Sequence, residues 1–74
     1  MERDTSMEYS LYQLASGISV NAEATGNAIS TLAELVRRGN KRALKYLEKL
    51  AEGDAKSPDL VKKAAAELKS ATAS

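Results

Sequence analysis

The chain has 74 residues, near the lower end of the size that folds alone, and it contains neither cysteine nor histidine. These absences exclude a disulfide scaffold, thiolate catalysis, cysteine-ligated zinc, and acid–base or metal chemistry that uses imidazole. The sequence has no stretch approaching the ~18 apolar residues that span a membrane, and no secretory signal at its start. We therefore expect a cytoplasmic protein that does not associate with membranes.

The composition predicts a thin core and an uneven charge distribution. Apolar residues make up 43% of the chain, but 13 of them are alanines, and Phe and Trp are absent. Such a core is often completed by a partner or a second copy, and a marginally stable monomer is an equal alternative. The net charge of +1 divides into −4 for residues 1–36 (one base, five acids) and +5 for residues 37–74 (ten bases, five acids). This division favours head-to-tail self-association or an acidic partner.

The first predicted helix covers about residues 7–18 and follows a polar start, residues 1–5, that we expect to be flexible. Ser6 is a candidate N-cap, and Glu8 lies in the first turn. Tyr9 lies opposite the apolar face, so we expect it to be exposed and able to anchor a partner, although single exposed aromatic residues are also ordinary. The apolar face of this helix consists of Met7, Leu11, Leu14, Ala15 and Ile18.

The second predicted helix ends near residue 38, and the sequence allows two positions for its start. Serine, glycine and valine within residues 16–21 have poor helix propensity and predict a break there. The helix then begins either at Ala22, tolerating Gly26 at a cost of ~1 kcal/mol relative to alanine, or near Asn27. Its apolar face, at helical spacing, consists of Ala28, Ile29, Leu32, Ala33, Leu35 and Val36.

A tight corner at Gly39 and Asn40 joins this helix to a third one, predicted at about residues 41–52. Gly39 suits a helix end because glycine adopts the left-handed conformation without a Cβ clash, and Asn40 is a strong N-cap. Gly53 closes the third helix. So short a connection makes the two helices spatial neighbours. The third helix has an apolar face formed by Ala43, Leu44, Tyr46, Leu47, Leu50 and Ala51.

A fourth helix is predicted at about residues 58–71, because Ser57, Pro58 and Asp59 form a strong helix start. Its apolar face consists of Leu60, Val61, Ala64, Ala65, Leu68 and Ala71. The sequence shows no alternating strand pattern and no long internal linker. We therefore expect one all-α domain over residues 1–74 with flexible ends at about 1–5 and 71–74. This domain is a small bundle of four short helices at about residues 7–18, 22–38, 41–52 and 58–71.

Two segments carry a family resemblance. They read AISTLAELVRRGNKRALKYLEKLAEG and SPDLVKKAAAELKS, within about residues 28–70. Their Ala/Leu-rich helix, short Gly-Asn turn, second Leu-rich helix and Ser-Pro-Asp helix start are similar to armadillo and HEAT repeats. The chain departs from these families because it is too short for the three or more repeats that such arrays usually need. The resemblance implies a scaffold that binds proteins and assigns no individual binding residue.

A basic cluster is the sharpest functional feature of the sequence. Six of the thirteen residues from 37 to 49 are basic, and Glu48 is the only acid among them. On the third helix, three lysines recur at i, i+4 and i+8 and point away from the apolar face. Such a row can bind phosphates or an acidic protein. The alternative is a helix face that only contacts solvent, which is the more usual role of a row of charges. The cluster consists of Arg37, Arg38, Lys41, Arg42, Lys45 and Lys49.

We expect a non-catalytic interaction module of the adaptor or inhibitor type that binds a protein through the basic cluster, with Tyr9 as a second contact. Nucleic-acid binding by the same residues and a structural homo-oligomer are the alternatives. An enzyme is disfavoured, because the carboxylate pairs Asp54/Asp59 and Glu48/Glu52 show no sign of a cleft or a raised pKa. The dispersed glycines form no phosphate-binding loop, and we expect no metal or cofactor.

Overall fold

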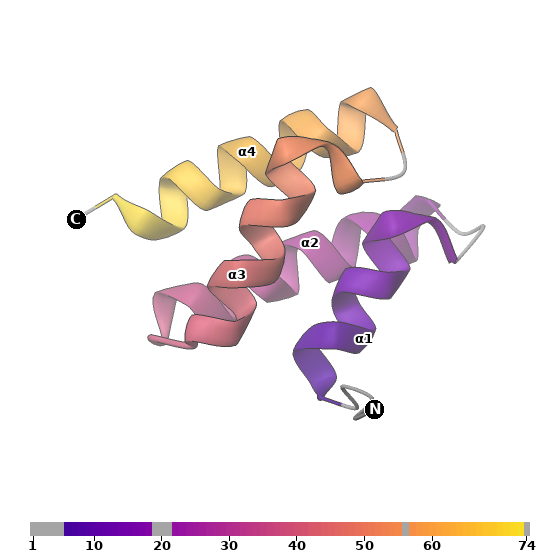
Figure 1. The fold of residues 1–74 in the computed structure, drawn as a ribbon. Helices are drawn as coiled ribbons and strands as arrows, with labels where there is room; N and C mark the ends of the chain where they lie inside the picture. The colour runs from indigo at the N-terminus through magenta and orange to yellow at the C-terminus, as the bar shows by residue number, and fades with distance from the viewer. Residues whose placement is uncertain (1–5, 19–21, 56, 74) are drawn as a thin grey trace.

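The computed structural model describes residues 6–18, 22–55 and 57–73, which form an all-α bundle of four helices with no strand among them (Figure 1). The fold class is therefore as expected, and the predicted helix boundaries are correct to within one or two residues. Of the ends predicted to be flexible, 1–5 and 71–74, residues 1–5 and 74 lie outside the described residues, and α4 continues through Thr72. The helices are α1 (Met7–Gln13, continued by a wide turn over Leu14–Ile18), α2 (Ala22–Arg37), α3 (Lys41–Lys49, continued by a wide turn over Leu50–Asp54) and α4 (Pro58–Thr72).

The starts of α1, α3 and α4 are capped by the side chains that the sequence indicates. Ser6, Asn40 and Ser57 each accept a hydrogen bond from the backbone amide three residues later, at 3.2, 2.9 and 3.4 Å. Each bond satisfies one of the amides that a helix start leaves without an intrahelical partner. These three helix starts therefore follow from local sequence alone.

The corner between α2 and α3 is closed by Gly39, whose φ is +89°. The Gly39 amide donates to the Val36 carbonyl at 2.9 Å, and the Asn40 amide donates to the Leu35 carbonyl at 3.0 Å. This pair of bonds is the Schellman motif, which satisfies carbonyls at the end of a helix and needs a left-handed residue at the glycine position. Asn40 then caps α3 directly, so no loop separates the two helices.

The structure resolves the open start of α2. The helix begins at Ala22, so Gly26 lies inside it. A Cβ added at Gly26 would meet the Lys63 Cε atom of α4 at 3.8 Å, an ordinary van der Waals distance. Gly26 therefore lies beneath a flexible side chain and occupies no site that requires glycine.

The core centres on α2 and α3, which cross each other while α1 and α4 pack beside them (Figure 1). The largest fully buried apolar side chains, Ile29, Leu32, Leu47 and Leu50, all come from α2, α3 and the turn that continues α3. Leucine and isoleucine thus supply the bulk that the missing Phe and Trp would otherwise provide. No helix among the described residues is both long and apolar enough to cross a membrane.

Among the side chains that the structure describes, which do not include Ile18, two members of the predicted apolar faces are exposed instead of buried. Met7 is 57% exposed, and Ala65 is exposed. Met7 is the first residue of α1, and α1 has no fully buried residue between Met7 and Gln13. On α4, Ala64 is fully buried, and Ala65 lies about 100° further around the helix, beyond the stripe that meets the core.

Candidate functional site

The three tyrosines of the chain form a cluster where α1 meets α3. Tyr9 and Tyr12 come from α1 and Tyr46 from α3, and their ring centroids lie 5.1 to 6.0 Å apart. Tyr46 is 7% exposed, whereas the other two rings are half-buried. We call these residues the tyrosine cluster. Aromatic pairs at such distances stabilise a contact by about 0.5–1.5 kcal/mol beyond the area they bury.

The prediction that Tyr9 is exposed is wrong. Its ring is half-buried and lies 5.7 Å from the Tyr46 ring. The reason is that α1 has two neighbours, since it packs against both α2 and α3. The apolar stripe of α1 covers one side, and the side that carries Tyr9 and Tyr12 meets α3. The i, i+3 spacing of Tyr9 and Tyr12 places them on one side of a helix. This spacing is the sequence feature that could have predicted a second buried side of α1.

Two hydrogen bonds between side chains reinforce the contact of α1 with the α3 region. The Tyr12 hydroxyl donates to Asp54 Oδ2 at 2.9 Å. The pKa of Tyr12 is raised above its ordinary value. Partial burial of the hydroxyl is the largest cause, and the hydrogen bond to Asp54 and the negative charge of Asp54 add to it. The Asn40 Nδ2 donates to Glu8 Oε2 at 2.6 Å, and this bond is the main reason that the pKa of Glu8 lies below its ordinary value. No local sequence pattern predicts either bond, because each joins residues more than thirty positions apart.

Three lysines of α3 form an exposed row on the side of the helix facing away from the core. Lys41, Lys45 and Lys49 are all exposed, and none forms an ion pair with any residue in the described part of the chain. We call these three residues the lysine row. The Lys45 Nζ lies 5.8 Å from the centroid of the Tyr46 ring. The lysine row therefore borders the tyrosine cluster. This contact is not evident from the sequence.

The remaining members of the basic cluster lie in different surroundings. Arg37 and Arg38 both pair with Glu34, at 3.6 Å each, and the Arg37 Nη2 also donates to the Ser70 hydroxyl of α4 at 3.1 Å. Arg37 thus belongs to the contact of α2 with α4, whereas Arg38 pairs with Glu34 of α2 itself. Arg42 is exposed on α3, and its charge contributes to lowering the pKa of Glu8. The structure therefore divides the predicted cluster into an α3 part and an α2 part.

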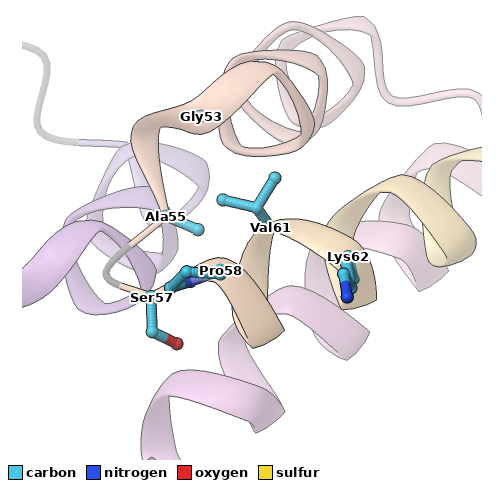
Figure 2. Close-up of a pocket in the computed structure, with 6 residues that line it drawn as sticks. All are labelled: Gly53, Ala55, Ser57, Pro58, Val61 and Lys62. Carbon is cyan, nitrogen blue, oxygen red and sulfur yellow. The ribbon is translucent and has the colours of Figure 1, made fainter.

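A shallow hollow of about 430 Å³ lies between the end of the α3 region and the start of α4 (Figure 2). Figure 2 shows the Ala55 and Val61 side chains facing each other across it. Its polar side chains are Ser57, whose hydroxyl caps α4, and Lys62 at the rim. Over the described residues there is also no cluster of three or more acidic side chains that could hold a metal ion. The hollow thus offers apolar contact and a single positive charge.

The double role of Asn40 yields a prediction on stability. Asn40→Ala removes the cap of α3 and the bond to Glu8, and should lower the free energy of unfolding by about 1–2 kcal/mol. Asn40→Ser keeps a capping hydroxyl and loses only the bond to Glu8, so its loss should be smaller. Urea unfolding followed by circular dichroism measures both. Equal losses in the two variants would show that the cap does not contribute.

Comparisons of the chain with known protein families, with curated proteins and with solved structures find no significant match. The functional inference therefore depends on the surface itself. That surface carries the lysine row, which α3 holds at fixed spacing because its opposite side is buried. Beside the row lies the tyrosine cluster, in which two rings are half-buried and Tyr46 is buried. Such a surface can bind anionic groups and bury apolar area beside them.

Proposed function

We propose that the protein is a non-catalytic interaction module, of the adaptor or inhibitor type, that binds an acidic protein through the exposed face of α3. The lysine row is the observation that supports this function most directly. Its three ammonium groups lack carboxylate partners among the described residues, and α3 itself is anchored by the buried Leu47 and by Leu50 just beyond its last turn. Arg42 extends the positive charge on the same helix.

A partner gains both steering and contact energy from this surface. Charge complementarity raises the rate of encounter and selects against partners of the same sign. Tyr9 is half-buried and lies next to Tyr46, the ring that Lys45 contacts, and tyrosine is a type of residue that often dominates binding energy. The resemblance of residues 28–70 to armadillo and HEAT repeats points to protein binding as well. The cytoplasmic location stays a prediction from sequence.

Nucleic-acid binding is the second candidate, because lysines lie beside aromatic rings. Single strands bind by stacking their bases on open aromatic faces over a positive groove. Here the Tyr12 and Tyr46 rings stack on each other at 5.1 Å, and the Tyr9 and Tyr12 rings stack at 6.0 Å. These faces are therefore already occupied, which favours a protein partner.

The test compares two triple variants with equal charge change. Lys41→Glu/Lys45→Glu/Lys49→Glu reverses the lysine row, and Lys62→Glu/Lys63→Glu/Lys69→Glu reverses three exposed lysines of α4. The probe is a synthetic peptide rich in Asp and Glu, with a single-stranded oligonucleotide as the alternative. Affinity for the peptide should fall about tenfold or more in the first variant, because each exposed charge pair contributes up to ~1 kcal/mol and reversal adds repulsion.

The α4 variant should bind the peptide within about threefold of the unmodified protein, since only long-range attraction is lost and salt screens it. Equal losses in both variants would show that net charge alone drives binding and would contradict the proposal. Circular dichroism of each variant verifies that its helices are intact. Binding of the oligonucleotide alone, with a log–log salt slope near about −2 for three phosphate contacts, would establish the second candidate instead.

A further inference from the structure

The lysine row has a spacing that limits what can bind along it. Successive lysines are four residues apart on α3, which places them about 6 Å apart along the helix axis, with each turned by about 40° from the last. A ligand that neutralises all three must therefore present anions at a matching interval and with a similar winding. A second α-helix with carboxylates at i, i+4 and i+8 has the same interval, and its row runs parallel to the lysine row when the two helices cross at about −50°.

Tyr9 lies against the same ring that Lys45 of this row contacts. Its ring lies 5.7 Å from Tyr46, and the Lys45 Nζ lies 5.8 Å from that same Tyr46 ring. The Tyr9 hydroxyl has no hydrogen-bond partner in the described part of the chain, in contrast to the Tyr12 hydroxyl, which donates to Asp54. Tyr9 can thus give a ligand both an apolar edge and a free hydroxyl.

We propose that the surface formed by the lysine row and Tyr9 binds an acidic amphipathic α-helix that crosses α3 at about −50°. The carboxylates of that helix face the lysine row, one of them accepts a hydrogen bond from the Tyr9 hydroxyl, and its apolar flank contacts the Tyr9 ring. This proposal rests on the proposed function, because it names the structural class of the acidic partner. It also assigns Tyr9 to the same binding surface as Lys45.

A helix fits this surface better than an extended acidic segment. Alternate side chains of an extended peptide lie about 6.6 Å apart, which is close to the lysine spacing. An extended peptide that adds a strand needs an exposed sheet edge, and the described residues contain no strand. A helix satisfies its backbone hydrogen bonds internally and binds through its side chains alone, which is what a helical surface can offer.

The experiment uses two synthetic peptides of identical composition, both hydrocarbon-stapled because free helices shorter than about 12–15 residues are marginal in water. The row peptide carries glutamates at i, i+4 and i+8 with leucines on the adjacent flank. The spread peptide places the same glutamates around the whole helix. Fluorescence anisotropy with the full chain should show the row peptide binding about tenfold more tightly, since only this peptide can pair all three lysines at once.

Two single substitutions locate the contact. Lys45→Gln should reduce the affinity for the row peptide and leave the spread peptide nearly unchanged, whereas Lys63→Gln on α4 should affect neither. Tyr9→Phe should weaken row-peptide binding while leaving the tyrosine cluster packed, and unfolding measurements verify that packing. If Tyr9→Phe has no effect on affinity, the assigned role of the Tyr9 hydroxyl is wrong.

The outcomes separate this proposal from the one on which it rests. Equal affinity for the row and spread peptides would show that the partner need not be a helix with carboxylates at i, i+4 and i+8. The proposal of an acidic protein partner would still hold. No binding of either peptide would overturn the proposed function itself. Tighter binding of a single-stranded oligonucleotide than of both peptides, reduced by Lys45→Gln, would overturn both in favour of nucleic acid.

Discussion

Leu47→Ala should lower the free energy of unfolding by about 2–5 kcal/mol, the usual range for removing a leucine side chain from a core. Leu47 is fully buried on α3, within the core centred on α2 and α3. The substitution loses the transfer free energy of the removed methyl and methylene groups and leaves a cavity that neighbours fill only in part. Urea unfolding followed by circular dichroism measures the change.

The matched control is Leu44→Ala, which makes the same chemical change one turn earlier on the same helix. Leu44 is only half-buried, so its loss should be clearly smaller. Small domains have a total stability of only a few kcal/mol, so Leu47→Ala can abolish folding outright. Leu47→Met, which nearly conserves volume, should cost less than about 1.5 kcal/mol and keeps the comparison measurable. Equal losses for Leu44→Ala and Leu47→Ala would contradict the deeper burial of Leu47 in this core.

Gly26→Ala and Gly39→Ala should shift stability in opposite directions, with a difference of about 2–3 kcal/mol between the two variants. Gly39 has a φ of +89°, where a Cβ costs about 1–2 kcal/mol even though its surroundings are open. Gly26 lies inside α2, where alanine is favoured over glycine by about 1 kcal/mol. The new Cβ would make only an ordinary contact, 3.8 Å from the flexible Lys63 side chain.

A third variant separates backbone strain from any other effect at the corner. Gly39→Asn should destabilise less than Gly39→Ala, because asparagine tolerates the left-handed conformation better than alanine. Thermal unfolding of the three variants gives the order directly. A loss of stability in Gly26→Ala similar to that in Gly39→Ala would show that Gly26 is needed for close packing against α4.

The sequence alone determined where α1, α3 and α4 begin and where α2 ends, but it left the start of α2 open. The caps at Ser6, Asn40 and Ser57 and the helix end at Gly39 all act within a few residues of their own position. A capping side chain reaches an amide three residues away, and a left-handed glycine acts through its own backbone torsions. The apolar periodicity likewise identified the leucines and isoleucine that fill the core.

The sequence also located part of the candidate site. The i, i+4, i+8 spacing of Lys41, Lys45 and Lys49 follows from helix geometry, and their exposure follows from the apolar residues opposite them. The arginines were grouped with these lysines because they are close in sequence. In space, Arg37 and Arg38 pair with Glu34, and Arg37 turns to α4, because the corner at Gly39 changes the chain direction.

Only the tertiary structure decided that the side of α1 opposite its apolar stripe packs against α3. That contact places the aromatic rings next to the lysine row. Helical periodicity predicts one buried stripe per helix, so it left Tyr9 exposed. Because α1 packs against both α2 and α3, a second side is covered, and Tyr9 and Tyr12 meet Tyr46 beneath Lys45. Contacts between residues thirty or more positions apart depend on how whole helices pack, and no local pattern encodes that arrangement.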